Sequence, residues 1–448
     1  MIEEVSAYIS KSGQVELPPE VVEKAKHHIL DTMAAMVSGS QLKPGRLARK
    51  YARSQAGVKE AQVIGSHTVT SAINAAFANG IMAHADETDD SHPKSYTHPG
   101  CGIVSAALSM SEREQADGMS FLKGVVAGYD IGCRMTQALG VDNLNRMHRS
   151  AHTIGPTFGA AAAAASVARL DAHQVRYVLS YTAQQTSGVK YWARDAEHVE
   201  KAFVFGGMPA RNGVTAAILV QSGFTGVEDP FSGQDNFIEA FSSSPEPHLL
   251  TQGLGNYYEI MFTNIKRFPV GSPIQAPLDA LLLIIKKHGI KSEDVRDIKA
   301  RLPAYGAKVV DNRNMPDVNL QYILAVTLLE GNLTFEAAHS YERMNDPAVL
   351  EIKKRIDLIE DPELTAAKII RQGIVEITTR DGTLFKEHVV SVRGTVENPL
   401  MRKEVEEKSQ DLMTPILGKD RALKLSEKIW NLEQVKNIRE LRPFLLPL

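Results

Sequence analysis

Apolar residues recur at helical spacing through most of the first two-thirds of the chain. In residues 17–39, two prolines open and a glycine closes a stretch whose apolar positions fit one helix face. Ser71 is placed to cap a second helix ending near Met82, and Ser120 to cap a third over residues 121–139. These patterns predict a helical bundle.

Small residues mark two of the predicted helices. Gly124, Gly128 and Gly132 fall four apart, so they share one helix face on which no side chain separates the backbone from a neighbour. Residues 159–166 are one glycine, six alanines and a serine, a composition that favours helix. We expect both segments to pack tightly inside the bundle.

The pattern changes after about residue 266. Two β-branched stretches, 374–379 and 383–392, flank an Asp-Gly pair at 381–382, which is a strong hairpin signal. Another strand and two helices surround this hairpin, so the portion is predicted to be α+β. Their expected ranges are 296–302 for the strand and 274–287 and 320–329 for the helices.

Helical patterns return beyond residue 399, over 400–412 and 419–432. A chain of 448 residues suggests two or three domains, at roughly 150 residues per domain. The sequence shows no fixed-period repeat.

Composition and charge exclude several classes of function. A net charge of −3 provides no basic field for nucleic acid, and no run approaches the ~18 apolar residues of a membrane helix. The acidic start has no signal-peptide pattern, so we expect a cytoplasmic protein. Cys101 and Cys133 are the only cysteines, which excludes a disulfide framework and a thiolate zinc cluster. No nucleotide-binding or acyl-transfer motif occurs, so no cofactor is expected.

The segment from His84 to His98 concentrates chemistry, with three histidines and four carboxylates between two apolar helices. A metal site is one interpretation, although the spacing matches no zinc or calcium template. Acid–base catalysis centred on His98 is the second. The third is structural, and for Asp89 and Asp90 it is at least as well supported as catalysis.

Two further clusters carry candidate residues. His148, Arg149 and His152 stand at a predicted helix entrance, where they could hold an anion. Lys201 lies in an apolar, glycine-containing stretch that would desolvate its ammonium and make it usable as a base. Lys266 adds a cation where the composition changes.

These segments together resemble the MmgE/PrpD family, nearly from end to end. The family loop reads His-Ala-x-Asp-Phe-Asp-Asp-Thr-His, followed by His-Pro-Gly or His-Pro-Ser. Here it is His-Ala-Asp-Glu-Thr-Asp-Asp-Ser-His over residues 84–92, then His98-Pro-Gly. Glu87 replaces the family's first aspartate and Ser91 its threonine. Gly-Phe-Thr-Gly at 223–226 and Lys-Arg-Phe-Pro at 266–269 extend the likeness.

The resemblance implies a fold and a set of site residues. The fold would be a large all-helical domain from residues 1–266 and 400–448, with a smaller α+β lid over 267–399 and the active site in the cleft between them. A homodimer is also implied. The implied catalytic residues are His98, Lys201, Tyr322 and His152, and the implied substrate-binding residues are Glu87, Ser91, His148, Arg149, Arg211, Lys266 and Gln275.

Some of these assignments stay open. The family's later histidine corresponds to His148 or to His152. The histidine that usually follows the lysine is replaced by the apolar residues 203–205, and another by Gln275. Because these polar groups are lost, the pattern is most similar to the family's epimerases.

The resulting hypothesis is an epimerase that removes a proton next to a carboxylate of a small anionic di- or tricarboxylate, similar to iminodisuccinate, without metal or cofactor. Lys201 and His98 would be its two bases, with Lys266, Arg149 and Arg211 neutralising substrate carboxylates. The alternatives are a lyase, resembling 2-methylcitrate dehydratase or cis-aconitate decarboxylase, and a non-catalytic carboxylate-binding protein.

Overall fold

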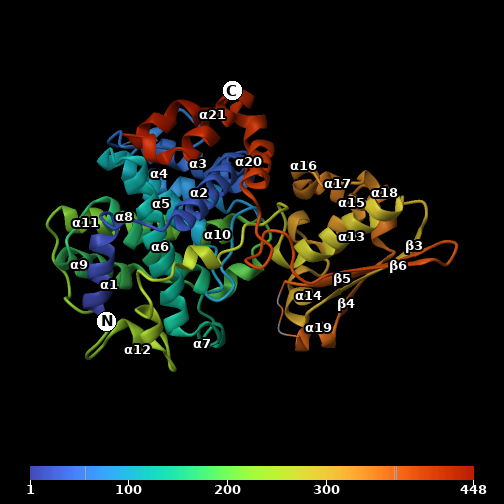
Figure 1. The fold of residues 1–448 in the computed structure, drawn as a ribbon, viewed down its shortest axis with the longest axis horizontal. Helices are drawn as coiled ribbons and strands as arrows, with labels where there is room; N and C mark the ends of the chain where they lie inside the picture. The colour runs from blue at the N-terminus through green and yellow to red at the C-terminus, as the bar shows by residue number, and fades with distance from the viewer. Residues whose placement is uncertain (56, 368, 370) are drawn as a thin grey trace. The chain divides into compact units, whose positions relative to one another are not determined.

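A computed structural model describes residues 1–55, 57–367, 369 and 371–448 (Figure 1). The chain forms two compact units. The helical unit contains Met1–Ala85, Asp89–Ile265 and Met401–Leu448, and the α+β unit contains Lys266–Leu400 together with Asp86–Thr88. Asp86–Thr88 belong to the polar loop, residues 84–98, which was predicted to lie wholly in the helical domain. The fold is mainly α, with one small mixed sheet.

The helical unit is built from both ends of the chain. Its helices are α1 (Ile2–Ser12), α2 (Pro19–Gly39), α3 (Lys43–Gln55), α4 (Ala72–Ala83), α5 (Pro99–Glu114), α6 (Gly118–Leu139), α7 (Val141–Arg146), α8 (Ala151–Val167), α9 (Ala172–Gln185), α10 (Val199–Ala202), α11 (Met208–Gln221), α12 (Phe237–Phe241), α20 (Arg402–Leu417) and α21 (Lys419–Trp430). A π-helix, η2 (Phe203–Gly207), joins α10 to α11, and shorter 3₁₀ segments are η1 (Lys190–Arg194), η3 (Pro247–Leu250), η4 (Glu259–Phe262), η7 (Leu432–Gln434) and η8 (Ile438–Phe444). Two short strands, β1 (Ala61–Gln62) and β2 (Val69–Thr70), pair antiparallel.

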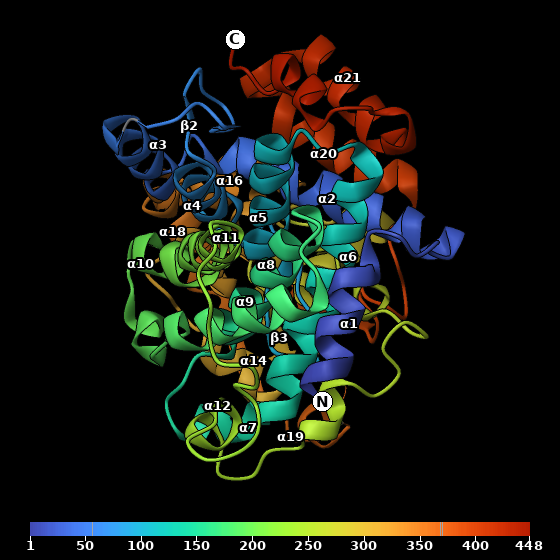
Figure 2. The same cartoon turned by 90° about the vertical axis from the view of Figure 1, so that its left-hand side faces the viewer.

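Helices α6 and α8 pack closely within this unit, and Figure 2 shows both among α1, α5 and α9. A Cβ atom on Gly132 would lie 2.8 Å from the carbonyl oxygen of Gly155, and one on Gly128 would lie 2.8 Å from that of Gly159. Those distances are shorter than a van der Waals contact, so the expected close approach at the glycine face is confirmed.

The predicted helix starts are correct in one case and wrong in another. The Ser71 hydroxyl accepts a hydrogen bond from the Asn74 amide at 3.3 Å, as expected of a cap. Helix α6 instead begins at Gly118, because the Asp117 carboxylate caps it by accepting from the Ser120 amide at 2.7 Å.

One helical segment is longer and more apolar than the sequence analysis allowed for. An 18-residue apolar window within Val199–Gln221 has a mean hydropathy of 1.2, so by length and composition alone this segment could cross a membrane. The structure buries 72% of the apolar window inside the helical unit. A core position accounts for this composition.

The α+β unit contains a four-stranded sheet of order β4-β3-β5-β6. Its strands are β3 (Val295–Leu302), β4 (Ile356–Glu360), β5 (Gly373–Thr379) and β6 (Leu384–Val389). Strands β3 and β4 are parallel and the other pairs antiparallel. The predicted hairpin is confirmed as β5–β6, and Gly382 in its turn has φ +91°, a conformation that favours glycine.

Helices pack on this sheet and build a separate core, which includes Ile298, Val375, Leu281 and Ile323. The helices of the unit are α13 (Gln275–His288), α14 (Ala304–Val310), α15 (Leu320–Glu330), α16 (Phe335–His339), α17 (Tyr341–Met344), α18 (Pro347–Lys353) and α19 (Pro362–Ala366), with 3₁₀ segments η5 (Ser272–Ile274) and η6 (Pro316–Val318). Helix α13 contacts β5 and β6.

Candidate functional site

The polar loop between α4 and α5 is buried rather than solvated. His84 follows the last residue of α4, and His98 precedes Pro99 at the start of α5. Asp89 and Asp90 are 0% exposed and His98 is 8% exposed. Buried charges of this kind need partners, so the contacts of each side chain indicate its role.

Asp89 holds two imidazoles. Its Oδ2 atom lies 2.8 Å from Nδ1 of His84, and its Oδ1 atom lies 3.0 Å from Nδ1 of His98. Burial favours the neutral carboxyl group, but His84 and His98 outweigh that effect and hold the pKa of Asp89 well below its ordinary value. A carboxylate only accepts hydrogen bonds, so each Nδ1 atom carries a proton toward it.

Asp90 supports the start of α5. Its carboxylate accepts from the Gly100 amide at 3.0 Å and from the Tyr129 hydroxyl at 2.5 Å, and it lies 2.8 Å from Nδ1 of His28. Burial lowers the pKa of His28 to about 4. Asp90 therefore has the structural role that was one of its two interpretations.

An aromatic stack brings His152 to His98. The His152 ring lies parallel to the Phe205 ring at 4.3 Å, with an interplanar angle of 9°. The His84 ring stacks with Phe205 at 4.4 Å and 20°. His152 is also 5.5 Å from His98 and 5.3 Å from Trp192, measured between ring centroids. Phe205 thus stacks with the imidazole rings of both His84 and His152.

Lys201 lies at the same group of rings. Its Nζ atom is 5.4 Å from the centroid of Phe205 and 5.9 Å from that of Trp192, within cation–π range. The side chain is half-buried, and its backbone amide donates to the Asp195 carboxylate at 2.9 Å. Lys201, His98 and His152 are therefore neighbours of one aromatic ring.

The start of α8 places the two later histidines in different surroundings. His148 precedes the helix, is exposed, and has φ +57°. His152 lies in the first turn, where it faces Phe205. His148, proposed as a substrate ligand, therefore lies apart from the stack because the helix begins after it.

The two arginines proposed to bind substrate both rest on aromatic rings. The Arg149 guanidinium is 4.1 Å from the centroid of Phe241. That of Arg211 is 5.7 Å from Phe77, and its Nε atom donates to Asn212 at 3.0 Å. The predicted role of each arginine in binding substrate stays a prediction.

Ser91 belongs to the helical unit and forms a short antiparallel bridge there. Its amide donates to the Asn264 carbonyl at 3.0 Å, and the Asn264 amide donates back at 2.8 Å. The backbone of Ser91 is therefore fixed, which positions its side chain in the loop.

Two of the predicted site residues in the α+β unit form an ion pair. The Lys266 ammonium donates to the Glu87 carbonyl at 2.8 Å and to its carboxylate at 3.1 Å, and both residues are buried. Nearby in the sequence, Asp86 pairs with His339 at 2.9 Å. Burial disfavours the imidazolium, but Asp86 outweighs it and raises the pKa of His339 to about 9.

Tyr322 and Gln275 are used by their own unit. The Tyr322 hydroxyl donates to the Ala337 carbonyl at 2.5 Å, and burial raises its pKa to about 12. The Gln275 amide group bonds the Phe268 backbone and the Val270 carbonyl. In this structure each of these polar groups is engaged within its own unit, and the predicted roles of Tyr322 as a catalytic acid and Gln275 as a substrate ligand stay predictions.

The loop could also be considered as a metal site. Ligand atoms of His84, Asp89 and His98 lie within 4.8 Å of one another. The two nitrogen–oxygen distances in this group are those of hydrogen bonds, with protons between the atoms.

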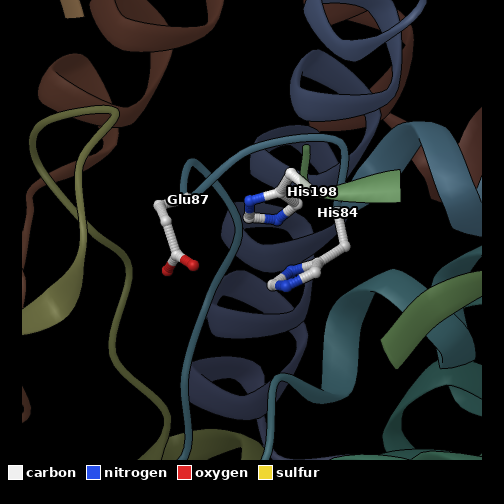
Figure 3. A group of neighbouring side chains, drawn as sticks. All are labelled: His84, Glu87 and His198. Atoms are coloured by element: carbon white, nitrogen blue, oxygen red, sulfur yellow. The ribbon is translucent and has the colours of Figure 1, made fainter. Parts of the chain in front are cut away.

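Sequence reasoning did not assign His84, His198, Trp192 or Phe205 to the site. The His84 and His198 rings are 5.1 Å apart, and Figure 3 shows them next to each other. A signal for His84 was present, because it opens the loop motif. Nothing in the sequence marked Phe205 as a site residue, since an aromatic residue in an apolar run is typical of a hydrophobic core.

Comparison with known proteins covers almost the whole chain. Residues 3–250 match the MmgE/PrpD N-terminal domain and residues 268–434 match the MmgE/PrpD C-terminal domain. Cis-aconitate decarboxylase of Homo sapiens is 24% identical over 94% of this chain and 89% of its own length. Cis-aconitate decarboxylase-like protein oryM of Aspergillus oryzae is 22% identical over 98% and 95%, and cis-aconitate decarboxylase of Aspergillus terreus is 21% identical over 98% and 94%.

Proposed function

The chain belongs to the MmgE/PrpD family, and from that premise we propose that it is a lyase acting on a small unsaturated polycarboxylate such as cis-aconitate. The observation that carries the proposal is the group of Lys201, His98 and His152 around Phe205. The names of the similar proteins, all cis-aconitate decarboxylases or decarboxylase-like, support a lyase over an isomerase.

Loss of CO₂ from such an acid places specific demands on a site. The bond between a carbon and its carboxylate breaks, its electron pair spreads into the neighbouring unsaturated carboxylate system, and a proton is then added to carbon. A cation must stabilise the developing negative charge, and an acid must deliver the proton.

The residues at hand meet both demands. Lys201 supplies a positive charge beside two aromatic faces, where low polarity strengthens its attraction for an anion. The Nδ1–H of His98 is held by an ionised carboxylate, which favours the imidazolium form whose Nε2–H is the proton donor, and His152 lies close enough to substitute for it.

The epimerase hypothesis uses the same residues but predicts a different chemical change in the substrate. It rests on the replacement of two family histidines, one by the apolar segment that contains Phe205 and the other by Gln275, and the similar proteins named above do not support it. Because both reactions deliver a proton to carbon, product analysis is what distinguishes them.

Proton NMR of the purified chain with cis-aconitate in heavy water is the direct test. We expect the vinyl signal of the substrate to disappear as a five-carbon unsaturated dicarboxylate forms with one deuterium on carbon and CO₂ is released. Deuterium exchange at the carbon next to a carboxylate of iminodisuccinate, a saturated tetracarboxylate, without change in cis-aconitate, would instead establish an epimerase. Binding of these acids without any chemical change would establish a carboxylate-binding protein and overturn both.

A further inference from the structure

Asp89 and His84 are two buried groups of the helical unit that the proposed reaction does not use directly. The Asp89 carboxylate lies between His84 and His98, with one oxygen for each Nδ1 atom. Both Nδ1 atoms therefore carry a hydrogen, and both Nε2 atoms are turned away from the carboxylate. A single side chain thus sets the tautomer of two imidazoles.

The His84 ring is held on several sides. It stacks on Phe205 at 4.4 Å, meets the edge of His98 at 5.0 Å and lies 5.1 Å from His198 (Figure 3). The side chain is 0% exposed. A ring confined in this way cannot turn to exchange its two nitrogens without breaking the bond to Asp89.

The Nε2 atom of His84 is buried, and among residues 1–55, 57–367, 369 and 371–448 it finds no hydrogen-bond partner. A buried nitrogen without a partner is unfavourable. Glu87, three residues along the loop, is engaged by Lys266 at 3.1 Å. The charged or titratable neighbours of His84 in its own unit are Asp89, His98 and His198.

We propose that Asp89 is a positioning residue for the pair His84 and His98, and that Nε2 of His84 binds a carboxylate oxygen of the substrate. This inference rests on the proposed function, since it deepens the same site. On binding of the anion, a proton from solvent occupies Nε2, and the imidazolium donates it to the substrate oxygen while Asp89 balances its charge. His98 is then left to act on carbon.

The contact can be measured without turnover. Tricarballylate is a saturated tricarboxylate that lacks the double bond needed for the proposed reaction. With ¹⁵N-labelled histidine in the full chain, long-range ¹H–¹⁵N spectra identify which ring nitrogens carry protons. We expect Nδ1–H and bare Nε2 for His84 in the free protein, and protonation of its Nε2 on addition of tricarballylate.

Matched substitutions separate binding from folding. His84→Phe keeps a ring against Phe205 and removes both nitrogens, so we expect tricarballylate affinity to fall at least tenfold. His28→Phe is the control, because His28 is equally buried and bonded to a neighbouring aspartate, Asp90. It should change affinity less than threefold.

Asp89→Asn tests the positioning role. An amide offers one acceptor and one donor, so one of the two imidazoles must move its proton from Nδ1 to Nε2, a change visible in the same spectra. Asp90→Asn, which alters contacts to His28 and Tyr129, should leave the tautomers of His84 and His98 unchanged.

Several outcomes would overturn the inference. The first is an unchanged His84 spectrum at millimolar tricarballylate, which includes the case of no binding. The second is a tricarballylate affinity of folded His84→Phe within threefold of that of the unsubstituted chain. The third is unchanged tautomers of His84 and His98 in Asp89→Asn. If His84→Phe does not fold, the spectrum of the unsubstituted chain still decides. A protonation of His84 without turnover of cis-aconitate would defeat the proposed function alone, and turnover with a silent His84 would defeat the inference alone.

Discussion

The candidate residues behave differently in the two units. In the helical unit, His98, His152 and Lys201 meet at one aromatic ring, that of Phe205. In the α+β unit, Tyr322 and Gln275 each bond to the backbone of that unit. Residue type alone therefore does not identify a site, because the fold around each side chain decides which groups it contacts.

The largest expected effect comes from the cation of the helical unit. Lys201→Met removes the ammonium and keeps much of the side-chain volume, so kcat for the polycarboxylate should fall about 10³-fold. Lys190→Met is the control, because Lys190 lies in η1 nearby and its ammonium bonds Asn145 at 2.9 Å. Turnover within tenfold of the unsubstituted chain in folded Lys201→Met would remove the lysine from the chemistry.

The two histidines beside α8 provide a second, smaller contrast. His152→Gln takes an imidazole from the stack on Phe205, and we expect kcat/KM to fall about 100-fold. His148→Gln changes an exposed residue outside the helix, so kcat/KM should stay within about twofold. Steady-state kinetics of both variants checks this, and equal losses would show that the assignment by helix start is mistaken.

The contrast between His148 and His152 also illustrates how much of the fold and of the site could be predicted from the sequence. The helices of the bundle, the β5–β6 hairpin and the chemistry of the loop were predictable, because periodicity, an Asp-Gly turn and a cluster of titratable residues are local signals. His148 and His152 are four residues apart, and only the position of the helix start decides which one faces the stack.

The contacts that build the site depend on distant parts of the chain. Phe205 reaches His84 and His152 from a π-helix, whose altered phase no helical periodicity anticipates. The hydroxyl of Tyr322 finds its partner fifteen residues away in the next helix. Such pairings are set by tertiary packing, so a motif alone could not reveal them.

Two buried histidines, one in each unit, should make the stabilities of the two units depend on pH in opposite directions. His339 has its pKa raised to about 9 by Asp86, so its stabilising contribution is complete below pH ~6.5 and is lost as pH rises through 9. His28 has its pKa lowered to about 4 by burial. His28 therefore binds a proton in the unfolded chain at a pH where it stays neutral in the folded chain. As a result, the free energy of unfolding falls as pH drops from ~6.5 to 4.

Urea unfolding across this range measures both effects. We expect Asp86→Asn to lower the free energy of unfolding by on the order of 2 kcal/mol at pH 6, with the difference from the unsubstituted chain shrinking above pH 9. His28→Phe should reduce the loss of stability on the acid side. An Asp86→Asn difference that stays constant from pH 6 to pH 10 would show that His339 is not held as a cation.

The smallest effect is expected for Tyr322, and it tests the comparison most directly. Tyr322→Phe removes a hydroxyl that donates to the Ala337 carbonyl, so the free energy of unfolding should fall by about 1 kcal/mol. Because that hydroxyl is already engaged, kcat should stay within about threefold. Urea unfolding and steady-state kinetics on the same preparation give both quantities.

Tyr129 is the matched residue of the helical unit, since its buried hydroxyl donates to the ionisable Asp90. A bond to a charged acceptor is stronger, so Tyr129→Phe should cost about 2 kcal/mol of stability, more than Tyr322→Phe. The contrary result is a 100-fold loss of kcat in Tyr322→Phe at nearly unchanged stability. It would mean that the hydroxyl leaves Ala337 for the substrate during turnover, and the α+β unit would then supply an acid to the reaction.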